Sequence, residues 1–193
     1  MVLLVGIVAG LIAGILRAII TRTPFRSIHL RGWWLVILAF VPQFLGFRLP
    51  ATAVNLSDEW APILLVGTQL LLLIFVWINR REPGCWLLGL GLLLNFTVIL
   101  LNGGLMPISP ETVVRIFPGT PETFWQVGER LGMAKDIVLP ETLTNLPLLS
   151  DRFTLPDWIP YRVAFSIGDV LIASGAFWLL WSMPDAKIDK EIV

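Results

Sequence analysis

The stretch Val163–Trp181, VAFSIGDVLIASGAFWLLW, is predominantly apolar and contains one charged side chain, the carboxylate of Asp169. A run of this length can cross a bilayer core of about 30 Å as a helix. A charged side chain at that depth is costly, and such side chains face a helix bundle or pair with a polar partner. The stretch therefore predicts a membrane helix, and it raises the question of what Asp169 contacts.

The composition extends this prediction to the whole chain. Of the 193 residues 56% are hydrophobic and only 15% are charged, whereas soluble domains contain about 25% charged residues. Further apolar runs predict an all-α integral membrane protein, a single membrane domain over 1–193 with five spans. The spans are expected at about 2–20, 33–48, 61–78, 85–101 and 163–182. The first is expected to be a retained span, because no basic residue precedes it.

Several classes of site and partner are excluded by residue counts. The chain has one cysteine, Cys85, and one histidine, His29. An internal disulfide and a Cys/His metal site are therefore excluded, and we expect no metal and no cofactor. The net charge is zero, which gives no indication of nucleic-acid binding. The expected partners are membrane lipids, together with membrane proteins or further copies of the chain.

Arginine and lysine in the connecting segments predict the orientation. The basic residues of the first loop, the third loop and the tail are Arg17, Arg22, Arg26, Arg31, Arg80, Arg81, Lys187 and Lys190. Because such residues concentrate on the cytoplasmic side, the N-terminus is expected outside, the C-terminus in the cytoplasm, and 102–162 as an extracytoplasmic cap segment. An aromatic belt at both membrane surfaces is predicted from Trp33, Trp34, Trp77, Trp86 and Trp181 at inner ends and from Trp60, Trp158 and Tyr161 at outer ends.

The cap segment is expected to contain two short helices. Ser109-Pro110-Glu111 and Thr120-Pro121-Glu122 each offer an N-cap hydroxyl, a proline suited to the first helical turn and an acid at the positive end of the helix dipole. The apolar contacts of these helices are expected from Val114, Phe117, Phe124, Trp125 and Leu131. The sequence that follows them is rich in proline and is expected to be extended.

Polar residues at a similar depth are the expected neighbours of Asp169. Gln69 lies eight residues into the third span and Asn95 seven residues before Asn102 in the fourth. Such groups usually face the bundle and hydrogen-bond to each other. On the fifth span, Arg162 and Ser166 are expected on the same face as Asp169, with Arg162 close enough to share its charge. This polar cluster is either a clamp that fixes the helix register or the setting of a functional carboxylate.

The stretch NGGLMP at 102–107 is expected to end the fourth span. Gly103 and Gly104 permit positive φ, and Pro107 prevents a helix from continuing. The motif is either a simple helix stop or a site lip beside Asp169.

Four stretches together resemble a known family. They are LRGWW at 30–34, NRREPG at 79–84, LLLNFTVILLNGGLMPIS at 92–109 and FSIGDVLIASGAF at 165–177. Their order and spacing resemble a family of small bacterial polytopic membrane proteins described only as a domain of unknown function. The resemblance implies a multi-pass protein of the bacterial cytoplasmic membrane, and it implies no activity.

A second resemblance is to lipoprotein signal peptidase. Ser150-Asp151-Arg152 and Phe165-Ser166-Ile167-Gly168-Asp169 look like the Asp-Arg and Phe-Asn-x-Ala-Asp motifs of that family, although the asparagine and the alanine are replaced. The resemblance implies that Asp151 and Asp169 form a catalytic dyad, which requires their carboxylates within hydrogen-bond or one-water reach.

Three functions follow as expectations. The first is a non-catalytic accessory or assembly subunit of a larger bacterial membrane complex. The second is an aspartyl intramembrane peptidase that uses Asp151 and Asp169. The third is a transporter of a small solute or protons, with Asp169 as the coupling acid, although no inverted repeat is evident.

Overall fold

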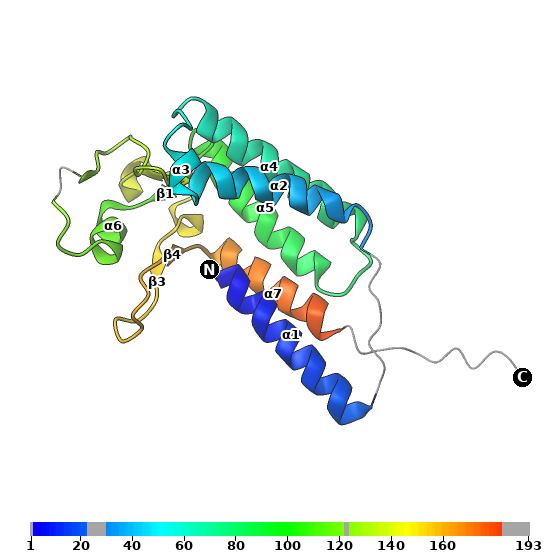
Figure 1. Cartoon of the computed structure of the whole chain (residues 1–193). Coiled ribbons are helices and arrows are strands. Elements are labelled where there is room, and N and C mark those ends of the chain that lie inside the picture. The colour runs from blue at the N-terminus through cyan, green and yellow to red at the C-terminus, as the bar shows by residue number, and fades with distance from the viewer. Residues whose placement is uncertain (1, 23–29, 122–123, 183–193) are drawn as a thin grey trace, which may run out of the picture.

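Five long apolar helices lie side by side in one open row in the computed structural model, which describes residues 2–22, 30–121 and 124–182. They are α1 (Val2–Thr21), α2 (Trp33–Phe47), α4 (Trp60–Ile78), α5 (Cys85–Leu101) and α7 (Ile167–Trp181). The main packing contacts follow the order α1–α7–α5–α4–α2, so α1 packs mainly on α7 and α2 mainly on α4. Figure 1 shows α1 at one side of the bundle, next to α7, and α2 in front of α4 and α5.

Two of these helices are long and apolar enough to cross a membrane. These segments are Leu3–Thr21 and Trp60–Ile78, each 19 residues long. Three further apolar helices, α2, α5 and α7, are shorter. The expected starts and ends agree with the observed helices to within about two residues for the first four runs, as is usual for helix boundaries.

The start of the fifth helix differs from the prediction. The chain is extended at β4 (Ala164–Phe165), and α7 begins only at Ile167. Ser166 provides the N-cap, and its hydroxyl accepts a hydrogen bond from the backbone N–H of Asp169. The apolar run from Val163 therefore contains a strand and a cap before the helix, and Asp169 lies in the first turn of α7 instead of inside a longer span.

Glycines bring α7 close to both of its neighbours. A Cβ on Gly10 of α1 would lie 2.8 Å from the Cα of Phe177, and one on Gly14 would lie 2.7 Å from the carbonyl oxygen of Leu180. On the other side of α7, a Cβ on Gly91 of α5 would lie 2.5 Å from the carbonyl oxygen of Gly168. Real Cβ atoms do not approach so closely, so the backbones meet here only because side chains are absent, as in other small-residue helix contacts.

The cap segment contains short strands and helices at one end of the row. Its elements are β1 (Met106–Ile108), α6 (Pro110–Ile116), β2 (Asp136–Val138), η2 (Glu141–Leu143), η3 (Pro147–Leu149), β3 (Phe153–Thr154) and β4. β1 and β2 are parallel, with Pro107 opposite Ile137, and β3 and β4 are antiparallel, with Phe153 opposite Phe165. α3 (Pro50–Ala53) joins α2 to the loop before α4 at the same end (Figure 1).

One of the two helices expected in the cap is present. α6 begins as predicted at Ser109, whose hydroxyl accepts a hydrogen bond from the Thr112 backbone N–H. The second is wrong over the described residues 125–132, which form turns and a bridge to β2; Phe124 is in 3-10 conformation, and residues 122–123 lie outside the described chain. Gly128 and Gly132 have positive φ there, a conformation that interrupts a helix. Leu131 is buried as expected, whereas Val114, Phe117 and Phe124 are exposed.

Arg130 fixes the cap to the row. Its side chain is 3% exposed and donates hydrogen bonds to the carbonyl oxygens of Leu56, Met133 and Ala134. The guanidinium also lies 5.3 Å from the centre of the Phe47 ring. These contacts join the cap to the α3–α4 loop and to the end of α2.

At each end of the row an asparagine joins a helix terminus to a distant loop. Asn102, after α5, accepts a hydrogen bond from the backbone N–H of Asn145 and donates one to its carbonyl oxygen. Asn79, after α4, makes the same pair of contacts with the backbone of Arg31. A side-chain amide suits this role because it offers both a donor and an acceptor.

Candidate functional site

The predicted neighbour of Asp169 is confirmed for Asn95. Nδ2 of Asn95 donates to Oδ1 of Asp169 at 2.8 Å, and the Ser166 hydroxyl donates to Oδ1 of Asn95 at 2.9 Å. The second carboxylate oxygen of Asp169 accepts from the backbone N–H of Ser166 at 3.3 Å, which completes a capping box. Ser166 is fully buried and Asn95 nearly so. These three residues bind α5 to the start of α7.

A second carboxylate lies beside this group. Asp151 is 3% exposed, and its Oδ2 accepts a hydrogen bond from Nζ of Lys135 at 2.8 Å. Nζ of Lys135 also lies 3.3 Å from Oδ1 of Asp136. Oδ1 of Asp151 is buried and has no hydrogen-bond partner among the described residues. The site therefore combines one lysine with three carboxylates, those of Asp136, Asp151 and Asp169. We call Asn95, Lys135, Asp136, Asp151, Ser166 and Asp169 the aspartate cluster.

The pKa of the Asp151 carboxyl is raised to about 7, and burial is the largest cause. Lys135 lowers the pKa, while the negative charges of Asp136 and Asp169 act with burial to raise it. The carboxylates outnumber the cation, so holding a proton on one of them relieves their repulsion. The pKa of Lys135 is raised as well: burial lowers it, but Asp136, Asp151 and Asp169 together outweigh that effect. Lys135 therefore remains charged while Asp151 titrates near neutral pH.

The NGGLMP motif brings Asp151 to this position. Gly103 and Gly104 both have positive φ, and they turn the chain from α5 into β1. The carbonyl oxygen of Pro107 in β1 accepts a hydrogen bond from the Asp151 backbone N–H at 3.0 Å. A Cβ on Gly104 would lie 2.6 Å from the Cβ of Pro62, so this turn also packs closely on the start of α4. The motif thus ends the helix, as expected, and also positions a carboxylate.

Three residues expected in the polar cluster lie elsewhere. Arg162 is exposed, and its Nη1 donates to the carbonyl oxygen of Arg115 at 3.2 Å. It precedes β4 and is not on the helix, so the shared face with Asp169 was wrong. The side-chain amide of Asn102 is hydrogen-bonded to the backbone of Asn145 and not to Asp169. Gln69 is buried on α4, and its Oε1 has no partner among the described residues.

The two aspartates expected to form a dyad share one electrostatic environment without a direct hydrogen bond. Asp169 uses its two oxygens for Asn95 and Ser166, and Asp151 uses one for Lys135. No hydrogen bond between the two carboxylates is present among residues 2–22, 30–121 and 124–182. In this arrangement a lysine, and not a second carboxylate, is hydrogen-bonded to Asp151.

Lys135 and Asp136 were missed in the sequence. Both lie between apolar residues of the cap segment with no motif around them, and they reach the cluster only because β2 pairs with β1. One signal in the sequence could have pointed to them: Lys135 and Asp136 form a charge pair directly before the apolar strand residues Ile137 and Val138.

Comparison with known proteins identifies a family for the chain but no activity. No curated protein and no solved structure matches it. One family model matches residues 27–181, described as "Family of unknown function (DUF5317)". The match covers α2 through α7 and all residues of the aspartate cluster. The chain belongs to this family, DUF5317.

Proposed function

We propose that the protein is a non-catalytic accessory or assembly subunit of a larger complex in the bacterial cytoplasmic membrane, with all five long helices crossing the bilayer. The observation that supports this most is the open row of helices. α1 packs mainly on α7 and α2 mainly on α4, and many apolar side chains of α1 and α2 are exposed and so left to lipid or to protein partners. A solute path in a transporter is usually enclosed between helix repeats, and a single row encloses none.

The polar residues of the site also favour a structural role. Asn95, Ser166 and Asp169 satisfy one another across the α5–α7 contact. Arg130 and Asn102 hold the cap against the helix ends in the same way. Side chains committed to such contacts stabilise one fixed shape, which suits a subunit that presents a rigid surface.

The proposed orientation places the cap outside the cytoplasm. Arg31, Arg80 and Arg81 lie at the opposite end of the row, where an excess of basic residues marks the cytoplasmic side. Exposed tryptophans at the same end, Trp33, Trp34, Trp77 and Trp86, suit a membrane surface. Cys85 is the single cysteine and is buried. Single-cysteine variants of a Cys85→Ser chain test the orientation: Ser57→Cys should be labelled from outside the cell, and Arg81→Cys only after the membrane is opened.

The subunit proposal is tested by purifying the tagged chain from its native membrane in mild detergent. Membranes of a second culture, which expresses the untagged chain and is labelled with heavy isotopes, are solubilised and mixed with the first before purification. A protein that binds only after solubilisation is then recovered in both its light and its heavy form. We expect one or more membrane proteins that are recovered at a fixed ratio to the chain and almost entirely in the light form. A chain that elutes alone, as a monomer or homo-oligomer, would contradict the proposal.

A second candidate, an aspartyl peptidase, is favoured by one observation. Asp151 is buried with a pKa of about 7, and the charge of Asp169 contributes to that value; a carboxyl that titrates near neutral pH can act as an acid or a base. Cleavage of a lipoprotein precursor by the purified chain, lost in both Asp151→Asn and Asp169→Asn, would support it. If the unaltered chain leaves the precursor intact, the peptidase candidate is contradicted.

A further inference from the structure

An open hollow lies at the end of the row away from the cap. Its volume is about 440 Å³, and it is lined by Arg80, Arg81, Glu82, Pro83, Gly84, Trp86, Leu87 and Trp178. These residues come from the turn between α4 and α5, from the first turn of α5 and from the last turn of α7. The volume is within the usual range for small-ligand sites, about 300–1,000 Å³.

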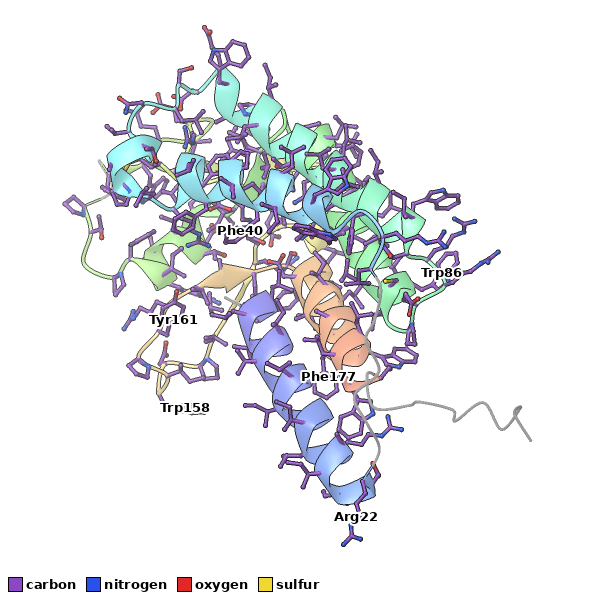
Figure 2. The ribbon with its side chains drawn as sticks, turned by 45° about the vertical axis from the view of Figure 1, so that its right-hand side comes forward. Arg22, Phe40, Trp86, Trp158, Tyr161 and Phe177 are labelled. Atoms are coloured by element: carbon purple, nitrogen blue, oxygen red, sulfur yellow. The ribbon has the colours of Figure 1, made fainter. Side chains whose placement is uncertain are left out.

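The hollow combines exposed indole rings with arginines. Trp86 and Trp178 are 70% and 53% exposed, and Figure 2 shows Trp86 projecting outward beside the start of α5. The guanidinium of Arg80 lies 4.8 Å from the centre of the Trp77 ring, and its Nη1 donates to the Trp77 carbonyl oxygen. Arg81 makes no hydrogen bond or ion pair with any other described residue. Its guanidinium is therefore available to a ligand.

The charge of the hollow favours an anion. Two arginines and one glutamate, Glu82, leave one net positive charge among the lining residues. The first turn of α5 starts after Gly84, which offers no side-chain cap. The backbone N–H groups at a helix start add to the attraction for negative oxygens. Arginine guanidinium groups bind phosphate oxygens through two parallel hydrogen bonds.

We propose that this hollow binds the phosphodiester headgroup of an anionic phospholipid. Basic pockets between membrane helices on the cytoplasmic side recognise such headgroups, and tryptophans with an exposed ring occupy the same depth of the bilayer. The glycerol and upper acyl carbons then lie against Trp86, Leu87 and Trp178, while the phosphate oxygens contact Arg80 and Arg81. The inference rests on the membrane insertion put forward above, but not on the identity of any protein partner.

The test uses the full chain purified in mild detergent. Phosphatidylglycerol and phosphatidylcholine of equal chain length are added together in equal amounts, and retained lipid is counted by native mass spectrometry. The thermal midpoint Tm is measured with each lipid and with inorganic phosphate. The variant is Arg80→Gln with Arg81→Gln. The matched control is Arg31→Gln, at the same end of the row but outside the hollow.

We expect the unaltered chain and the Arg31→Gln control to retain phosphatidylglycerol preferentially. We expect the double variant to lose this preference by about tenfold, because charge-assisted hydrogen bonds to phosphate are removed. Equal retention of the two lipids by the unaltered chain, or an unchanged preference in the double variant, would overturn the proposal. So would inorganic phosphate raising the Tm as much as phosphatidylglycerol, because the ligand would then be free phosphate.

Two further measurements keep the result interpretable. Arg81→Gln alone, at an exposed position without a described partner, replaces the double variant if that variant aggregates, and the same loss of preference is expected. Carbonate extraction of membranes reports insertion separately. A chain that extracts as a soluble protein contradicts the proposed function, whereas an inserted chain without lipid preference contradicts only the headgroup site.

Discussion

Asn95 of α5 donates a hydrogen bond to Asp169 of α7 across 2.8 Å, and the two residues are 74 positions apart in the chain. The contact is possible because Gly168 has no side chain: a Cβ there would collide with the Asn95 amide. The amide in turn accepts from Ser166, the N-cap of the same helix. One asparagine thus fixes both where α7 begins and how it packs on α5.

This contact predicts a graded loss of stability at Asp169. Asp169→Ala removes the capping box and leaves the Asn95 amide unpaired, with an expected cost of about 2–4 kcal/mol. Asp169→Asn keeps one acceptor for Asn95 and should cost about half as much. Thermal unfolding in detergent measures both, with Asp157→Ala at an exposed position as the control. Equal unfolding midpoints for Asp169→Ala and the control would contradict the role given to this carboxylate.

Stability should fall as the pH rises toward neutrality, because of Asp151. Its folded-state pKa is about 7, against an ordinary value of 3.8. Between these values the folded protein holds a proton that the unfolded chain has released, so this contribution is complete below pH 3.8 and is lost as the pH passes 7. We expect the Tm to decrease from pH 5 to pH 8 and the decrease to flatten in Asp151→Asn. An Asp151→Asn variant that keeps the full slope would show that other groups titrate.

Close glycine contacts predict opposite effects of one substitution at two sites. Gly10→Ala places a Cβ 2.8 Å from the Phe177 backbone, and such overpacking costs about 1–3 kcal/mol. Gly67→Ala, on α4 with open space around it, should instead stabilise by about 0.5–1 kcal/mol, because alanine is the better helix former. The two Tm values should therefore move apart. A stabilised Gly10→Ala variant would show that α1 does not pack on α7 in this way.

Arg130 should control whether the cap stays closed against the row. Arg130→Lys keeps the charge but cannot reach the three carbonyl oxygens that the guanidinium satisfies. We expect cleavage by a soluble protease within the cap segment 102–162 to become at least about tenfold faster, which corresponds to about 1.4 kcal/mol of lost protection. Arg152→Lys, whose partner Glu141 is exposed, is the control. Equal cleavage rates in the two variants would contradict the anchoring role.

Local features of the sequence were enough to predict much of the helical framework. Long apolar runs specify helices, and Gly103 with Gly104 turns the chain after α5. The pairing of Asn95 with Asp169 was also predictable, because two polar groups at equal depth in apolar helices have few other partners. These predictions depend only on periodicity, capping and the cost of burying polar groups.

Tertiary structure alone decided the rest. The run from Val163 reads as one helix, but pairing of Phe165 with Phe153 draws its first residues into a strand and moves Arg162 away from Asp169. Lys135 reaches Asp151 only because β2 pairs in parallel with β1, whose residues lie 30 positions earlier in the chain than their partners in β2. Strand pairing between distant segments leaves no short-range signal, since each strand here is two or three residues long. The sequence by itself determined the five apolar helices, except for the start of α7, and one polar contact. Long-range backbone pairing determined which charges meet.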